Sequence, residues 1–269
     1  MSNDLTIRRA ESPEDYQSCQ DAQRRAWSLS DESYIVPIAT LVGANRHGGL
    51  VLGAFRPDGM AVGVSFGFLG RIGTRLGLYS QLTGMVPEYQ GKGLGRRLKQ
   101  AQFDWAVEQG LEVVGWAFDP LQAGNARFNL DTLGATCGQY IDNMYGPRND
   151  PLNSGVPTDR LIAEWDPHPQ PRPHLPDDPI PILPQLAGWT EPEGPLVLLE
   201  IPADIQRLRW EDPAAAEQWR SQVRHGLTTA FAQGYRAVGT IREDVEGRQR
   251  CYYLLHRLSE TTDAWPYRL

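Results

Sequence analysis

The chain has 269 residues, enough for about one and a half to two typical domains and a full apolar core. Its 26 Lys and Arg against 33 Asp and Glu give a formal net charge of -7, which argues against a general nucleic-acid binder because such a protein needs a basic face. The cysteines Cys19, Cys137 and Cys251 are odd in number and widely spaced, a pattern that supports neither a disulfide framework nor a zinc site and indicates a reducing compartment.

The first segment predicts strands and one helix. A strand is expected at "LTIRR" (residues 5–9), followed by a helix that begins near Ser12 and Pro13. "GGLVLGAF" and "MAVGVSFGFLG" form a predicted hairpin around the turn signal "RPDG", and "LGLYSQLTGMV" is a further strand that ends at Pro87. No apolar leader and no stretch long enough to span a membrane are recognisable, so the sequence predicts a cytoplasmic protein without a membrane partner.

The next segment predicts a long amphipathic helix over residues 93–109, ending at Gly110. Its apolar stripe consists of Leu94, Leu98, Ala101 and Trp105. A buried strand "LEVVGWAF", a short helix "AGNARFNLDTLG" and two late strands, "ATCGQYIDNMYG" and "DRLIAEW", complete a β-α-β-β-β-α-β-α-β-β order.

The remaining sequence divides the chain into three predicted parts. Residues 1–165 are the core, residues 166–195 are a proline-rich linker or wrapping segment, and residues 196–269 are a βαββ unit. A unit of this size is marginal alone and is expected to dock on the core. It can serve as a cap over the substrate site or as the interface of a homodimer, and the sequence leaves both open.

"MVPEYQGKGLGRRLK" (85–99) places three alternate glycines at the mouth of the long helix. Glycine lets a ligand approach the main chain, and the first helical turn offers unpaired N–H groups at a positive dipole end, so the pattern suits a phosphate. The Walker and dinucleotide-binding spacings both fail here, because Lys92 is followed by Gly93 and the glycines read GxGxG. A glycine-rich helix start needed only for tight packing is the alternative.

The hexapeptide Gln90–Gly95 matches [QR]-x-x-G-x-[GA], and with its flanking strand and helix it resembles the acyl-CoA loop of the GNAT superfamily of N-acyltransferases over residues 5–165. The resemblance implies an α+β (α/β-like) fold with a central mixed, mainly antiparallel sheet, splayed central strands and flanking helices. "HGGLVLGAF", "WAFDPL" and "NARFNLDTLGA" are similar to a GNAT subgroup often encoded beside N-acylamino-acid (N-succinylamino-acid) racemases. This implies acyl-CoA as co-substrate, either succinyl-CoA or acetyl-CoA, and an amino acid as acceptor.

The resemblance also implies cofactor-binding residues. The main chain before the loop, including Met85 and Val86, would hold the pantetheine arm, with Asn125 as a further contact or, alternatively, a helix N-cap. The pyrophosphate would lie on the loop and the first helical turn, which consist of Gln90, Gly91, Lys92, Gly93, Leu94, Gly95 and Arg96. Arg97 and Lys99 would add positive charge nearby.

The acid and base that many GNAT relatives use are absent. Tyr79 stands where they carry a glutamate, and Leu130 where they carry a tyrosine. Asp119, at the end of a central strand, is a candidate base or else a turn-forming residue, while Tyr79 is a candidate proton relay or part of the acceptor site. Tyr145 and Tyr140 are candidate acids for the leaving thiolate, with aromatic packing as the alternative.

Arginines, cysteines and histidines are further candidates for binding and for chemistry. A carboxylate on the substrate calls for an arginine, and the sequence does not choose among Arg75, Arg148 and Arg160. Cys137 is expected to be a buried structural thiol and not a nucleophile, and no histidine pair has metal-ligand spacing, so no metal is expected.

The sequence therefore predicts a CoA-dependent N-acyltransferase that acts on the primary amine of a small molecule by direct attack in a ternary complex. Two alternatives remain: an N-acetyltransferase of a peptide or protein amine, and a non-catalytic acyl-CoA-binding or assembly module.

Overall fold

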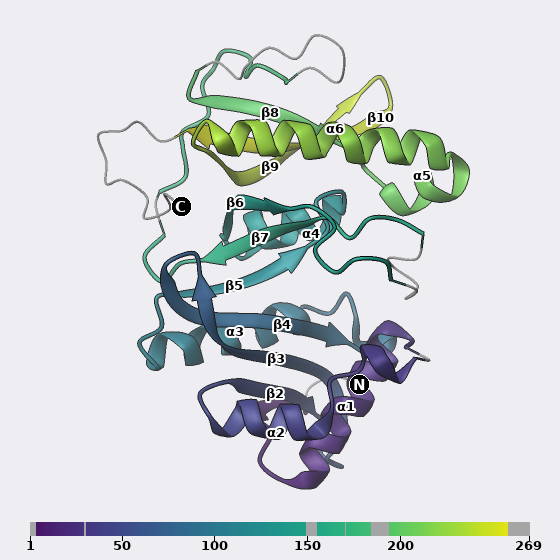
Figure 1. The fold of residues 1–269 in the computed structure, drawn as a ribbon, viewed down its shortest axis with the longest axis vertical. Helices are drawn as coiled ribbons and strands as arrows, with labels where there is room; N and C mark the ends of the chain where they lie inside the picture. The colour runs from purple at the N-terminus through teal and green to yellow at the C-terminus, as the bar shows by residue number, and fades with distance from the viewer. Residues whose placement is uncertain (1–3, 30, 149–154, 170, 184–193, 258–269) are drawn as a thin grey trace. The chain divides into compact units, whose positions relative to one another are not determined.

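The computed structural model describes residues 4–29, 31–148, 155–169, 171–183 and 194–257. They form two compact units (Figure 1). The first runs to Trp116 and includes Pro147–Val156, and the second comprises Ala117–Gly146 and the chain from Pro157 onward.

The first unit has the predicted sheet and helices, plus one helix that the sequence analysis missed. Its elements are β1 (Thr6–Arg9), α1 (Pro13–Trp27), α2 (Ile38–Arg46), β2 (Leu50–Phe55), β3 (Ala61–Ile72), β4 (Arg75–Met85), α3 (Leu94–Glu108) and the start of β5 (Val113–Phe118), with short 3-10 turns at Glu32–Tyr34 and Pro87–Tyr89. The strands lie in the order β1-β2-β3-β4-β5 and are antiparallel except for the parallel pair β4 and β5. This confirms the mixed, mainly antiparallel sheet.

Alternate residues of β2 face opposite helices, as the two-residue period of a strand requires. Val51 and Phe55 belong to a core cluster with residues of α1 and α2. Leu50 and Leu52 belong to a second cluster that includes Leu98 of α3. Burying an aliphatic side chain of this size contributes about 1.5–3 kcal/mol, so all three helices are held on the sheet by packing.

The central strands separate, as the sequence predicted. β4 pairs with β5 only from Gly77 to Tyr79, opposite Val113–Gly115, although β4 itself continues to Met85. On its other side β4 pairs with β3 along most of its length, with a bulge that leaves Gln81 outside the register. The second half of β4 therefore borders β5 without a paired ladder among the described residues.

The second unit contains the rest of the elements. They are α4 (Ala123–Arg127), a π-helical turn (Phe128–Thr132), β6 (Thr136–Ile141), β7 (Arg160–Trp165), β8 (Leu196–Ile201), α5 (Ile205–Glu211), α6 (Pro213–Ala232), β9 (Tyr235–Val245) and β10 (Arg248–Arg257). The strand order is β7-β6-β9-β10-β8, and β6 meets β9 at Cys137 and Ala237. The βαββ pattern is confirmed, but its helix is two helices, because Asp212 and Pro213 interrupt it.

Part of the proline-rich segment runs beside β8. Leu198 N donates to Pro181 O at 2.8 Å, and Leu183 N donates to Leu198 O at 2.7 Å. Ile180 packs on the apolar face that contains Leu198 and Tyr252. Residues 170 and 184–193 of this segment lie outside the described residues.

Among the helices in the described ranges, none combines the length and hydropathy needed to cross a membrane. The same residues contain no group of three or more His, Cys, Asp or Glu side chains arranged to hold a metal ion.

Candidate functional site

The glycine-rich loop opens directly onto the start of α3. Gly91 and Gly93 have φ values of 71° and 74°, in the left-handed region where L side chains are strained. A Cβ built at either position meets no atom within 4 Å, so both glycines border open space. A ligand can therefore approach the loop backbone from the side where other residues would carry a side chain.

The N-terminus of α3 is arranged to receive an anion. Gly93 is the N-cap residue, and no side chain in the described parts of the chain caps this end. The first N–H groups of a helix point along its axis without partners inside the helix, next to the positive end of its dipole. Lys92, Arg96 and Arg97 are exposed around them. This geometry fits a phosphate or pyrophosphate group.

Hydrogen bonds within the protein hold the loop in place. Gln90 Nε2 donates to Met85 O at 3.0 Å, and Lys92 Nζ donates to Glu88 O at 2.7 Å. Val86 N donates to Val62 O at 3.0 Å, so the main-chain polar groups of Met85 and Val86 already have partners here. These residues shape the loop, and the main chain from Gly91 onward offers the donors.

A buried polar cluster lies beneath the loop, between α3 and the sheet. Lys99 is 5% exposed, and its Nζ donates to Ser80 Oγ at 2.9 Å and to Gln102 Oε1 at 3.3 Å. Gln102 Nε2 donates to Ser65 Oγ at 2.9 Å, and Ser65 Oγ lies 2.8 Å from Thr83 Oγ1. Burial lowers the pKa of Lys99 from 10.5 to about 7.

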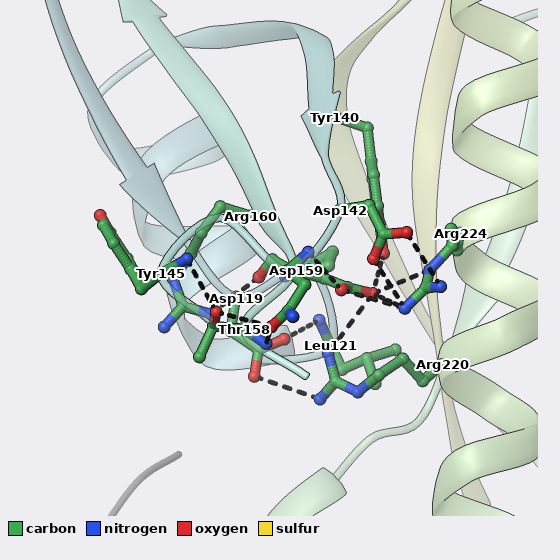
Figure 2. Close-up of polar contacts among 12 residues, drawn as sticks. Asp119, Leu121, Tyr140, Asp142, Tyr145, Thr158, Asp159, Arg160, Arg220 and Arg224 are labelled. Carbon is green, nitrogen blue, oxygen red and sulfur yellow. Dashed lines mark hydrogen bonds and ion pairs between the residues drawn. The ribbon is translucent and has the colours of Figure 1, made fainter. Parts of the chain in front are cut away.

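In the second unit, a charged cluster forms where β5, β6 and β7 meet α6 (Figure 2). Arg220 of α6 is 2% exposed, and its Nη2 lies 3.6 Å from Asp119 Oδ2. Its Nη1 lies 3.8 Å from Asp159 Oδ2 and has no hydrogen-bond partner among the described residues. Asp119 Oδ1 accepts a hydrogen bond from Leu121 N at 3.0 Å.

Asp159 is the centre of this cluster. Tyr140 Oη donates to its carboxylate, Asn143 N donates at 3.1 Å, and Arg224 Nη2 donates at 2.9 Å. Burial would raise the pKa of Asp159, but these hydrogen bonds outweigh it and hold the pKa below its usual range. Burial, followed by the bond to Asp159, raises the pKa of Tyr140. The Tyr140 proton is thus committed to Asp159, which weakens its candidacy as an acid.

The other predicted chemical residues lie as follows. Tyr79 belongs to the last β4 pair with β5, and its ring packs 5.5 Å from that of Phe68. Tyr145 is 38% exposed, and the guanidinium of Arg160 lies 5.2 Å from its ring centre. Asn125 is exposed inside α4, whose N-cap is Gln122, so the alternative reading of Asn125 as an N-cap is wrong.

The remaining residues named in the sequence analysis lie in the following surroundings. Leu130 is fully buried, and burial raises the pKa of the Cys137 thiol, which favours the expected structural role over a nucleophilic one. Arg148 lies 4.4 Å from the ring centre of Tyr34. Arg75 begins β4. Arg160 Nη1 donates to Asp159 O at 2.7 Å.

Arg220 and Asp159 are not recognisable as site residues from the sequence, because no local pattern indicates that Arg220 on α6 lies beside Asp119, about a hundred residues earlier. Lys99 reads in the sequence only as a nearby charge. A signal was present, since just two of the 26 basic residues are lysines, Lys92 and Lys99, and both lie in this loop and helix.

Residues 6–129 match the model of the acetyltransferase (GNAT) family. This segment is similar to GNAT acetyltransferases. It extends from β1 into the π-helical turn after α4 and makes up less than half of the 269 residues. The GNAT match supports the predicted fold class and does not select the narrower racemase-associated subgroup.

Several solved structures of acetyltransferases are similar to this chain. A putative GNAT acetyltransferase from Desulfovibrio desulfuricans is 17% identical, over 60% of this chain and 98% of that one, with a TM-score of 0.48. The ribosomal-protein-S18-alanine N-acetyltransferase from Escherichia coli is 17% identical, over 60% and 93% of the two chains, with a TM-score of 0.45. Naa50 from Arabidopsis thaliana, solved with a bisubstrate analogue, is 15% identical over 60% and 98%, with a TM-score of 0.46. Comparison with curated proteins gave no match.

Proposed function

We propose that this GNAT protein transfers an acyl group from acyl-CoA to the primary amine of an amino acid. The donor is succinyl-CoA, with acetyl-CoA as the alternative. The observation that carries the proposal is the open loop at Gly91–Gly95. It follows β4, whose pairing with β5 stops after three residue pairs.

The loop accounts for the donor. Several main-chain N–H groups at the start of α3, with exposed Lys92 and Arg96 beside them, are suited to the pyrophosphate of CoA. The second half of β4, from Leu82 to Gly84, is the segment expected to hold the amides of the pantetheine arm. Each such hydrogen bond contributes only about 1 kcal/mol, so the strand mainly positions the thioester.

Two neighbouring side chains of the second unit account for the acceptor class. The Asp119 carboxylate can receive an ammonium group, and Arg220 Nη1 is a buried donor without a hydrogen-bond acceptor among the described residues. An amino acid offers both an ammonium group and a carboxylate. Arg220 Nη1 is 3.8 Å from Asp159 Oδ2 and makes no hydrogen bond to it, so a substrate carboxylate could supply the missing charge-assisted hydrogen bond.

The proton chemistry is assigned to this chain's own residues. An amine with a pKa near 8–10 is mostly protonated at pH 7, so it must lose a proton before it attacks the thioester. The sequence candidates are Asp119, which can take that proton directly or through water, and Tyr145, which is 38% exposed and can supply a proton to the leaving thiolate. Tyr79 relays protons or lines the acceptor site.

Mass spectrometry of reaction mixtures tests the proposal. The purified full chain is incubated with acetyl-CoA or succinyl-CoA in separate tubes, each with a pool of D- and L-amino acids and, in a parallel arm, with peptides that have free N-termini. We expect an N-acyl amino acid that is absent without enzyme. The mass added to the amino acid identifies the donor.

Two results would overturn parts of the proposal. An acylated peptide without any acylated amino acid would replace the acceptor class with a peptide amine. CoA binding by calorimetry, without product from any amine, would favour the non-catalytic acyl-CoA-binding module.

A further inference from the structure

Lys99 is a buried amine, and no anion among the described residues is in contact with it. Its partners are uncharged: the Ser80 hydroxyl, the Gln102 amide, and the ring of Trp116, whose centre lies 3.8 Å from Nζ. Buried lysines are rarely tolerated unless paired, because removing an ammonium from water is costly. The site therefore favours the neutral amine.

The residue type at this position is informative. The chain uses arginine for nearly all of its 26 basic positions and has only two lysines. A guanidinium stays protonated in proteins, whereas an amine can exchange its proton near neutral pH when it is buried. Lysine at position 99 therefore provides a proton exchange that arginine cannot provide.

The cluster lies where the strands part. Ser80 follows Tyr79, the last β4 residue that pairs with β5, and precedes the bulge residue Gln81. Trp116 follows Gly115, the last β5 residue that pairs with β4. Lys99 reaches from α3 to both strands at the first position beyond their shared ladder.

We propose that Lys99 is the proton acceptor of the acyl transfer, acting through the Ser80 hydroxyl at the separation of β4 and β5. This inference rests on the proposed function, because it requires the thioester to lie along β4 beyond Tyr79. It gives this enzyme a base on α3 in place of the glutamate that Tyr79 replaces, and Asp119 then only binds the acceptor's ammonium group.

The reaction removes two protons from the acceptor's ammonium group. Its nitrogen bonds to the acyl carbon while the carbon–sulfur bond breaks, and one of the protons converts the departing thiolate to the free thiol. The other passes to Ser80 Oγ as Ser80 gives its own proton to Lys99 Nζ. The resulting ammonium is stabilised by the face of Trp116 until the proton returns to solvent.

Nearby groups leave Lys99 free to serve this role. The pKa of Lys99 is lowered by burial, with no contribution from a charged neighbour. On the elements packed around it, β3 presents Ser65 and β4 presents Ser80. The nearest titratable side chains along the chain are Tyr79 on β4 and the exposed Arg96 and Arg97 on α3.

The ionisation of Lys99 can be measured directly. In the full chain labelled with 13C at the lysine Cε atoms, NMR will show two signals, and Lys99→Gln assigns them to Lys92 and Lys99. We expect Lys99 to titrate with a pKa of about 7. A value above about 9 would overturn the proposal, because the amine would then stay protonated in the range where the reaction runs.

The pH profile of turnover separates a proton acceptor from a structural residue. We expect kcat/KM of the wild type to decrease at pH values below the pKa of Lys99. Lys99→Met is expected to lower kcat by about 10²-fold or more and to remove this acidic limb, with little change in the Kd of CoA. Lys99→Arg should do the same, since a guanidinium accepts no proton. Gln100→Met, an exposed neighbour on the same helix, is the control and should match the wild type.

A second variant protects the test from a folding failure. Ser80→Ala leaves Lys99 in place and interrupts the relay, and it should also lose the acidic limb. If both variants keep the wild-type profile while product still forms, this inference is wrong and the proposed function stands. If the wild type acylates no amine at all, the proposed function fails first, and this inference fails with it.

Discussion

Arg220 Nη2 on α6 lies 3.6 Å from Asp119 Oδ2, just beyond the end of β5. Arg220 is 2% exposed and also faces Asp159, which is fully buried. A buried ion pair adds little net stability, because desolvation offsets its attraction, but removing one member leaves an uncompensated buried charge. Losing either member of the pair should therefore cost more stability than the pair itself adds.

Replacing Arg220 should destabilise the protein strongly. We expect Arg220→Met to lower the free energy of unfolding by about 3–5 kcal/mol, because two carboxylates lose their buried partner. Urea unfolding followed by circular dichroism measures this. Arg207→Met is the matched control: Arg207 pairs with Glu211 on exposed α5, and its loss should leave the free energy of unfolding nearly unchanged. Equal effects of the two variants would contradict the buried-pair interpretation.

Two glycines of α3 allow a matched test of the loop. Gly93 begins the helix with φ 74° and Gly110 follows its end with φ 70°, and a Cβ at either meets no atom within 4 Å. Alanine should therefore cost each site a similar stability, about 1 kcal/mol. Only Gly93→Ala should weaken CoA binding, by about tenfold or more in calorimetry, because its methyl group lies on the approach to the helix N-terminus. A Gly110→Ala variant with an equally weakened Kd would show that strain is the cause.

Lys99 predicts a pH dependence of stability. Its folded pKa, about 7, lies below the 10.5 of an exposed lysine. Between these values the unfolded chain binds more protons, so stability should rise as the pH rises from about 7 to 10. The limit for the full shift is about 5 kcal/mol. Denaturant unfolding of Lys99→Met should lack this rise, whereas Lys92→Met should retain it. The difference between the two variants separates the contribution of Lys99 to the pH dependence from that of the tyrosines and thiols that titrate in the same range.

Acid should weaken the start of α1. Both Nη atoms of Arg8 lie 2.6 Å from the Asp15 carboxylate, and this bond lowers the pKa of Asp15 from 3.8 to about 2. The stabilisation is complete above pH 4 and is lost as the pH falls toward 2. Arg8 is 40% exposed, so solvent screening limits the effect to about 1–2 kcal/mol. Thermal melts of Asp15→Asn should show a flatter dependence between pH 4 and 2, while Glu14→Gln, in the same turn, should behave as the wild type.

The sequence allowed much of the fold to be predicted, because local signals coincide with the structure. Ser12 and Asp15 form the capping box that begins α1, and the leucine spacing after Gly93 produces α3. The turn at Glu246 and Gly247 joins β9 to β10, with positive φ at both residues. These features depend on neighbours in sequence, which is why periodicity and turn chemistry find them.

The remainder depends on contacts that no local pattern encodes. Helix α2 begins at Pro37 without a side-chain cap and contains β-branched residues, so its sequence reads poorly as a helix until it packs on β2. The pairing of Arg220 with Asp119 spans about a hundred residues. The lowered pKa of Lys99 comes from burial by elements that are far apart in the sequence. From the sequence alone, a lysine is expected to be an exposed charge.

The pairing of Cys137 on β6 with Ala237 on β9 makes one continuous hydrogen-bonded surface from strands on both sides of the proline-rich segment. A boundary that is clear in composition is thus not a boundary in the backbone ladder. Expressing residues 1–165 alone would strip β6 of that neighbour and leave a bare strand edge able to recruit other chains. Strands β6 and β7 and the C-terminal strands are therefore expected to be inherited and engineered as one piece.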